Sequence, residues 1–186
     1  LGDIGSGKSY VANKFGYPVF SADVEVAKLY NKNRKCYNKL KKALPKYIIS
    51  FPIKKNEIIE AIMAEQHNLK KIVKIIHPEV RSSMNNFIKK NKKKKFIILD
   101  IPLLIENKIN RKKDILVFVD TKKTIINKRL KKRRNFNRKI AEKLGKFQLP
   151  VEIKKKKSNY IIKNNFKNNS IKKDVKKMIE KILLNA

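Results

Sequence analysis

The chain has 186 residues, of which 41% are hydrophobic, and a formal net charge of +34. This length and composition are typical of one compact globular domain that carries a smaller insertion. No run of about 18 apolar residues is present, so we expect no membrane-spanning helix and no membrane partner. The single cysteine, Cys36, cannot form a disulfide or a cysteine-based metal site within the chain, which favours the reducing cytoplasm.

The positive charge comes almost entirely from lysine, because the chain has only seven arginines. Lysine, asparagine and isoleucine share A/T-rich codons, so a compositional bias explains the charge without a polyanionic partner. We therefore expect the lysine runs at 92–95 and 154–157 to be solvated faces or loops, and we expect no specific nucleic-acid partner. A basic surface would still attract an anionic substrate.

The first element in chain order is a phosphate-binding loop. Residues 2–9 match G-x-x-x-x-G-K-[ST], the P-loop pattern. The backbone N–H groups of such a loop surround a phosphate, Lys8 would reach the β- and γ-phosphates, and the Ser9 hydroxyl would ligate Mg²⁺. The motif therefore predicts ATP and Mg²⁺ as ligands. Because a buried strand normally comes before this loop, we expect a short first strand to be missing ahead of Leu1.

The next part of the chain is mainly helical. A helix over 9–15 is followed by a short strand that starts at 19–20 and ends near Asp23. From 24 to about 91 the pattern is mostly helical, with apolar stripes at 58, 59, 62 and 63 and at 69, 72, 73 and 76. Pro78 directly follows His77 and predicts the first turn of a new helix.

Three apolar runs in the second half, over 96–101, 115–120 and 160–162, predict buried parallel strands. Helices are predicted over 124–134, 138–147 and 170–184. Alternating strands and helices predict a three-layer α/β domain with a parallel sheet. Ligands of such sheets bind at the carboxyl ends of the strands.

Carboxylates are scarce, and those at Asp23, Asp100 and Glu106 follow apolar segments. Asp23 could accept the proton of an attacking hydroxyl, or it could be a helix N-cap. Asp100 has the placement of a Walker-B carboxylate that holds Mg²⁺, with a structural turn before Pro102 as the alternative. Glu106 follows three apolar residues and could equally be a plain surface residue.

Arginine is concentrated in one basic segment, at Arg129, Arg133, Arg134 and Arg138. Guanidinium groups fit the charge that spreads over phosphoryl oxygens, so this segment could be a lid. A solvated basic helix is the alternative, above all for Arg134 and Arg138. His77 and Arg81 could grip a second phosphate-bearing ligand, although a histidine such as His77 is more often structural.

At this point the sequence resembles the dephospho-CoA kinase family over nearly its whole length. The residues that carry the resemblance are the segments 5–9, 22–23, 76–81 (Ile-His-Pro-Glu-Val-Arg), 99–106 (Leu-Asp-Ile-Pro-Leu-Leu-Ile-Glu), 128–130, 133, 148–150, 160–162 and 164. The resemblance implies a P-loop kinase fold with a helical substrate-binding insertion over 24–92 and a helical lid over 129–150, all within one domain over 1–186. It implies transfer of the ATP γ-phosphoryl group to the 3′-hydroxyl of dephospho-CoA.

The resemblance also implies roles for single residues. Asp23 matches the catalytic base and acts with Lys8 and Arg133 in catalysis, while Ser9 and Asp100 match the Mg²⁺ site. The ATP-binding residues it implies are Gly2, Ile4, Gly5, Ser6, Gly7, Lys8, Ser9, Tyr10, Arg129 and Asn164. The residues it implies for dephospho-CoA are Asp23, His77, Arg81, Asp100, Leu103, Leu104 and Glu106. One departure is Asp3, which stands where the family usually has glycine.

Two other hypotheses remain open from the sequence alone. The chain could be a P-loop kinase that acts on another nucleoside or small-molecule acceptor. It could also be a basic nucleic-acid-binding protein with a vestigial P-loop, in which case binding would weaken steeply with salt.

Overall fold

The computed structural model describes residues 1–133 and 136–184, so Arg134 lies outside the described residues. The chain forms two compact units. The first unit comprises Leu1–Val19 and Phe96–Ala186, and the second comprises Phe20–Lys95. The described residues contain no helix that is long and apolar enough to cross a membrane.

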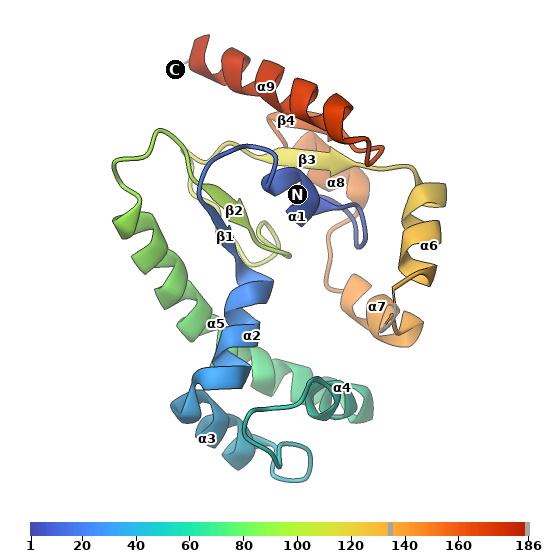
Figure 1. Cartoon of the computed structure of the whole chain (residues 1–186). Helices are drawn as coiled ribbons and strands as arrows, with labels where there is room; N and C mark the ends of the chain where they lie inside the picture. Colours follow the sequence, from blue (N-terminus) through green and yellow to red (C-terminus); the bar gives the residue numbers. More distant parts are fainter. Residues whose placement is uncertain (134–135, 185–186) are drawn as a thin grey trace. The chain divides into compact units, whose positions relative to one another are not determined.

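The first unit contains the parallel strands that the sequence predicted (Figure 1). Strand β3 (Val117–Asp120) pairs in parallel with β4 (Tyr160–Lys163), with Phe118 opposite Ile161. Gly2 forms an isolated parallel bridge to Val119, which places the start of the P-loop beside β3. Strand β1 (Val19–Ser21) pairs with β2 (Ile98–Asp100), and the boundary between the units falls inside β1, after Val19.

Among the described residues of the first unit, five helices accompany the strands. They are α1 (Lys8–Ala12), α6 (Lys123–Lys131), α7 (Arg138–Gly145), α8 (Val151–Lys156) and α9 (Asn168–Leu184). Helix α9 lies beside β4 (Figure 1), because its apolar residues recur every three or four positions and form one face. That face buries Ile171, Val175, Met178 and Ile182 against Val11, Val119 and Ile162. The predicted α/β class with parallel strands is confirmed.

The second unit is a bundle of four helices, α2 (Ala22–Lys32), α3 (Arg34–Ala43), α4 (Lys55–Ala64) and α5 (Gln66–Lys90). Helix α5 packs against the other three. The prediction that Pro78 opens a new helix is wrong, since Pro78 lies inside the continuous α5. A proline removes one backbone hydrogen bond, but α5 buries Leu69, Ile72, Ile76 and Met84 on both sides of it. This burial outweighs the local cost and keeps the helix in one piece.

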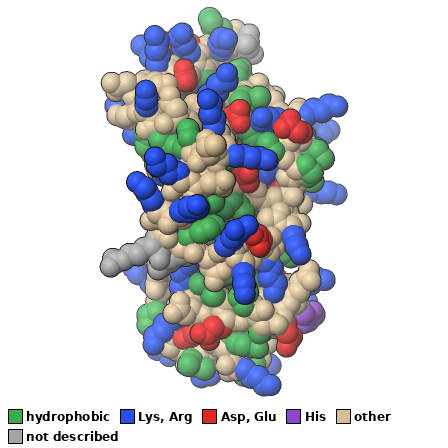
Figure 2. Space-filling view, turned by 90° about the vertical axis from the view of Figure 1, so that its right-hand side faces the viewer, with side chains coloured by type: hydrophobic (Ala, Val, Ile, Leu, Met, Phe, Trp, Pro, Cys, Tyr) green, Lys and Arg blue, Asp and Glu red, His purple; other side chains and the backbone are tan. Residues whose placement is uncertain are grey.

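Lysine and arginine side chains are spread over the face shown in Figure 2 and do not gather into one patch. The chain carries 49 such residues against 15 acidic ones, so most of them have no nearby carboxylate to pair with. This distribution agrees with the compositional origin that the sequence suggested for the charge.

Candidate functional site

The P-loop has the backbone conformation that its glycines predict. Gly7 precedes α1 in the left-handed conformation, with φ of 85°. A Cβ on Gly7 would come within 2.5 Å of the Asn164 amide nitrogen and 2.6 Å of the Phe166 ring. Only glycine meets both the dihedral angle and the space, so the sequence constrains the loop at this point.

Two side chains donate hydrogen bonds to the carbonyl oxygen of Ser6. Thr121 Oγ1 donates to Ser6 O at 2.9 Å, and Asn164 Nδ2 donates to the same oxygen at 2.8 Å. Thr121 directly follows β3 and Asn164 directly follows β4, so adjacent parallel strands deliver both donors to one edge. Ser6 is fully buried, and no described residue forms a hydrogen bond with its hydroxyl.

The Lys8 side chain contacts the backbone of its own P-loop. Its ammonium donates to the carbonyl oxygens of Gly2 at 3.3 Å and Asp3 at 2.9 Å. The Asp3 carboxylate accepts from the neighbouring Ile4 N–H at 2.7 Å, so Asp3 bonds to the backbone of its own loop. Weak backbone acceptors hold the Lys8 ammonium here, and a phosphate oxygen is a stronger acceptor that can replace them.

Ser9 and Asp100 meet beside the P-loop. The Ser9 hydroxyl, on α1, donates to Asp100 Oδ2 at 2.5 Å, and Asp100 ends β2 with only 8% of its surface exposed. No cluster of three or more His, Cys, Asp or Glu residues occurs in the described part of the chain. One carboxylate and one hydroxyl still fit Mg²⁺, because this ion keeps several waters and takes its other ligands from phosphates.

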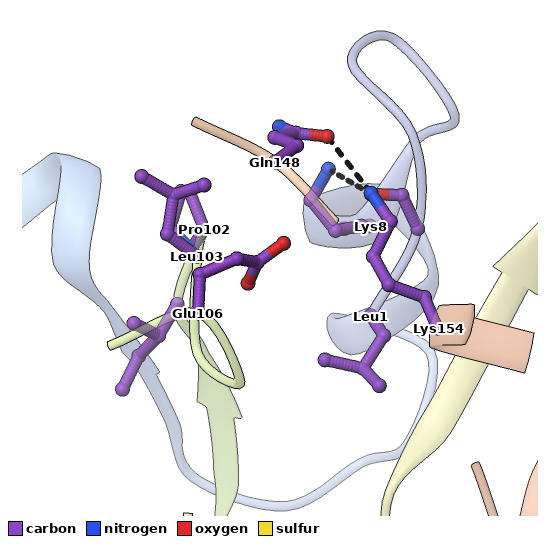
Figure 3. Close-up of a pocket in the computed structure, with 9 residues that line it drawn as sticks. Leu1, Lys8, Pro102, Leu103, Glu106, Gln148 and Lys154 are labelled. Carbon is purple, nitrogen blue, oxygen red and sulfur yellow. Dashed lines mark hydrogen bonds between the residues drawn. The ribbon is translucent and has the colours of Figure 1, made fainter. Parts of the chain in front are cut away.

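A pocket opens beside the loop, within the first unit (Figure 3). Its lining includes Lys8, Leu103, Glu106, Gln148 and Lys154. Leu103 has a left-handed backbone conformation, with φ of 55°, which is strained for a leucine. Strained residues of this kind cluster at binding and active sites. Glu106 Oε1 accepts from the backbone N–H of Leu149 at 3.0 Å, which ties the segment after β2 to the segment before α8.

Leu104, implied for the substrate site by the resemblance, is only 8% exposed and does not line this pocket. Lys154 contradicts the expectation of a solvated lysine run. Its residue surface is only 3% exposed, and its ammonium donates to Gln148 Oε1 at 2.9 Å. The expectation was wrong because residues 151–156 form α8, and the helical period turns one of the four lysines inward.

Arg129 lies beside the P-loop through an aromatic contact. Its guanidinium lies 3.6 Å from the centre of the Phe166 ring, and the Tyr10 ring lies 5.6 Å from the same ring. The Phe166 N–H donates to Asn164 Oδ1 at 2.9 Å, so Asn164 contacts both the loop and Phe166. Arg133, two residues after the end of α6, is exposed.

The second unit carries three of the residues implied for the acceptor. Asp23 is exposed in the first turn of α2, and the N-cap position belongs to Ser21, whose side chain forms no capping hydrogen bond. His77 and Arg81 lie four residues apart on α5 and therefore on one helix face. Burial and, to a smaller extent, the positive charge of Arg81 lower the pKa of His77, which favours its neutral form.

Sequence reasoning missed Thr121, Phe166 and Lys154. Thr121 could have been found from the sequence. It directly follows the apolar run that ends at Asp120, and ligands bind at the ends of such strands. The other two carried no local signal. Phe166 follows a polar pair, and Lys154 stands among three other lysines.

Comparisons with known proteins place this chain among enzymes of one kind. A family model described as dephospho-CoA kinase matches residues 1–170. The dephospho-CoA kinase of Wolbachia pipientis wMel is 31% identical over 100% of this chain and 97% of its own length. That of Fusobacterium nucleatum subsp. nucleatum is 32% identical over 97% of this chain and 95% of its own.

Two solved structures share the fold, each at 23% sequence identity and each matching 97% of this chain and 94% of its own. A Thermus thermophilus protein superposes with a TM-score of 0.74, and the dephospho-CoA kinase from Campylobacter jejuni with a TM-score of 0.64. These likenesses agree with the P-loop kinase fold expected from the sequence.

Proposed function

Because the chain belongs to the dephospho-CoA kinase family, we propose that its P-loop, the Ser9–Asp100 pair and Asp23 carry out the reaction of that family. The reaction is the last step of coenzyme A synthesis, in which the γ-phosphoryl group of ATP passes to the 3′-hydroxyl of dephospho-CoA. The products are coenzyme A and ADP. The observation that carries the assignment of residues is the contact between the P-loop hydroxyl and the strand-end carboxylate, at 2.5 Å.

Lys8 binds the β- and γ-phosphates of ATP in this proposal. Its ammonium exchanges the Gly2 and Asp3 carbonyls for phosphate oxygens, and backbone N–H groups of the P-loop surround the same phosphates. Tyr10 and Arg129, which both contact Phe166, border the nucleotide on the side of α6. Asn164 supports the nucleotide site through the Ser6 carbonyl.

Ser9 and Asp100 would hold Mg²⁺, which supplies a positive charge that bridges and neutralises phosphate oxygens. The short Ser9–Asp100 contact supports this role, because the two groups already lie within the reach of one ion. Asp100 has a second role toward the acceptor, since it begins the segment that continues through Leu103, Leu104 and Glu106.

Asp23 is the proposed catalytic base. It accepts the proton of the ribose 3′-hydroxyl while that oxygen forms its bond to the γ-phosphorus. The bond from the γ-phosphorus to the bridging oxygen breaks at the same time, and ADP leaves. The exposed position of Asp23 in the first turn of α2 supports this role, because an acceptor hydroxyl can reach an exposed carboxylate.

His77 and Arg81 bind dephospho-CoA, and the helical unit is the CoA-side part of the enzyme. Their place on one face of α5 supports a shared ligand, and the neutral His77 can donate and accept hydrogen bonds. Residues 129–150 form the lid, and Arg133 stabilises charge on the transferring group from there. Consumption of ATP supports a cytoplasmic site of action.

The test measures ADP release from MgATP with and without dephospho-CoA, and then with other nucleosides as acceptors. We expect release only with dephospho-CoA. Replacing Asp23 by asparagine should lower kcat by about 10²-fold or more while ADP binding is retained. Asp174→Asn, on α9, is the matched control. Unchanged turnover in Asp23→Asn would remove Asp23 from the mechanism, and equal activity with another acceptor would reassign the substrate.

A further inference from the structure

Lys154 is a buried cation in the pocket beside the P-loop. It is 3% exposed, and the hydrogen-bond acceptor of its ammonium is the neutral amide oxygen of Gln148, at 2.9 Å. In the parts of the chain that the structure describes, no carboxylate lies within 4.0 Å of this ammonium. A buried charge without a counterion is costly, so proteins retain one where a ligand or a reaction needs it.

Lys154 reaches the pocket from α8 and Lys8 reaches it from the P-loop (Figure 3). Glu106 also lines the pocket and brings one carboxylate to it, whose Oε1 accepts from the Leu149 N–H. The Lys154 ammonium donates to the uncharged Gln148 oxygen, and the Lys8 ammonium donates to the Gly2 and Asp3 carbonyls. The residues that line the pocket thus include two lysines and one carboxylate, that of Glu106, so the lining carries a net positive charge.

We propose that Lys154 binds the transferring phosphoryl group together with Lys8, with Gln148 as the acceptor that its ammonium leaves when the phosphate arrives. The proposal rests on the proposed function, because it places the γ-phosphoryl group of ATP in this pocket. A phosphate supplies the negative charge that Lys154 lacks and adds it to a lining of net positive charge. As charge moves toward the leaving oxygen during transfer, a cation in a shielded pocket stabilises it more than water would.

The neighbouring lysines provide an internal contrast. Lys155 forms ion pairs with Asp120 at 3.6 Å and Glu152 at 3.9 Å, and Lys156 is exposed. Only Lys154 combines deep burial with a place in the pocket lining, so a general attraction of basic residues for ATP does not account for its position.

The experiment compares Lys154→Met and Lys154→Arg with Lys156→Met as the matched control. Methionine keeps the length of the side chain and removes the charge. We expect Lys154→Met to lower kcat/KM for MgATP by about 10²-fold, Lys154→Arg to recover much of it, and Lys156→Met to match the wild type. Without ligand, Lys154→Met should melt at the same temperature as the wild type or higher, because an uncompensated buried charge is gone.

A purely structural lysine would give the opposite pair of results, with a lower melting temperature and a proportionate loss of active enzyme. That outcome would overturn the proposal, as would an active Lys154→Met enzyme with wild-type kinetics. A second variant, Gln148→Glu, places a carboxylate on the ammonium and should raise KM for MgATP, whereas an unchanged KM would also contradict the proposal. Failure of the proposed function is recognised separately, because the wild-type protein would then show no transfer to dephospho-CoA.

Discussion

Asn164 donates a hydrogen bond to the Ser6 carbonyl of the P-loop, and its replacement by alanine tests whether this bond stabilises the loop. The substitution removes the hydrogen bond from Asn164 Nδ2 to Ser6 O, at 2.8 Å, and the one from the Phe166 N–H to Asn164 Oδ1, at 2.9 Å. Each such bond contributes about 1 kcal/mol to stability, and the unpaired Phe166 N–H adds a cost of similar size. We expect a loss of about 2 to 3 kcal/mol, or about 5 to 10 °C in melting temperature.

We expect Asn164→Ala to weaken nucleotide binding as well, because the orientation of the Ser6–Gly7 peptide group depends on the lost hydrogen bond. In a trans peptide the carbonyl and the N–H point to opposite sides, so a Ser6 carbonyl held in the interior directs the Gly7 N–H toward the inside of the loop. Without Asn164, Thr121 is the side chain left, among the described residues, to donate to that carbonyl. We expect the Kd for ADP to rise about tenfold, which corresponds to about 1.4 kcal/mol.

The double-mutant cycle with Thr121→Val separates this mechanism from general destabilisation. Valine keeps the shape of threonine and removes the donor to Ser6 O, at a cost of about 1 kcal/mol. With both donors gone, the buried carbonyl has no side-chain partner, so the double variant should lose about 1 kcal/mol more than the sum of the single variants. The melting temperature by calorimetry and the ADP affinity by titration give the two readouts.

Asn165→Ala is the matched control, because Asn165 is exposed and its side chain accepts from the Lys167 N–H, at 2.9 Å, and forms no hydrogen bond with a P-loop atom within the described part of the chain. Its effect on stability should stay within about 0.5 kcal/mol. Additive single effects in the cycle, together with an unchanged Kd for ADP, would refute the idea that these two donors orient the loop.

Three further predictions concern other parts of the site. Gly7→Ala should abolish tight ADP binding and lower the melting temperature, because a Cβ there meets Asn164 at 2.5 Å; a folded variant with normal affinity would contradict this. Asp100→Asn should raise the Mg²⁺ concentration needed for half-maximal turnover by about tenfold, measured by Mg²⁺ titration at saturating ATP, and an unchanged titration would exclude Asp100 from the metal site. Burial, with the charge of Arg81, lowers the pKa of His77, so the unfolded chain binds more protons and stability falls as the pH drops below about 6.5. The melting temperature of His77→Gln should therefore fall less than that of the wild type between about pH 7 and 5, and parallel curves would contradict the assignment.

The sequence by itself determined the parts of the site whose chemistry is local. A P-loop needs glycines at fixed spacing for backbone reasons, so Gly7, Lys8 and Ser9 were recognisable without a structure. Short apolar runs that end in aspartate located β2 and β3, and hence Asp100, because a buried strand must be apolar along its length. The family resemblance came from these ordered segments.

Continuity of α5 through Pro78 was decided only by tertiary structure. Local rules end a helix at proline, but burial of apolar residues before and after Pro78 keeps the helix continuous. The same kind of packing decided which lysine of the run at 154–157 is buried. Four identical side chains carry no local signal, and only the orientation of α8 turns Lys154 into the pocket.

The two hydrogen bonds from Thr121 and Asn164 to the Ser6 carbonyl were also decided only by tertiary structure. The two donors lie 43 residues apart in the sequence, and the parallel register of β3 and β4 brings their strand ends together. Periodicity in a sequence reports which face of an element is apolar, whereas the convergence of polar groups on one atom depends on how elements pair. For that reason the phosphate loop could be identified from the sequence, while the residues that hold it in shape required the fold.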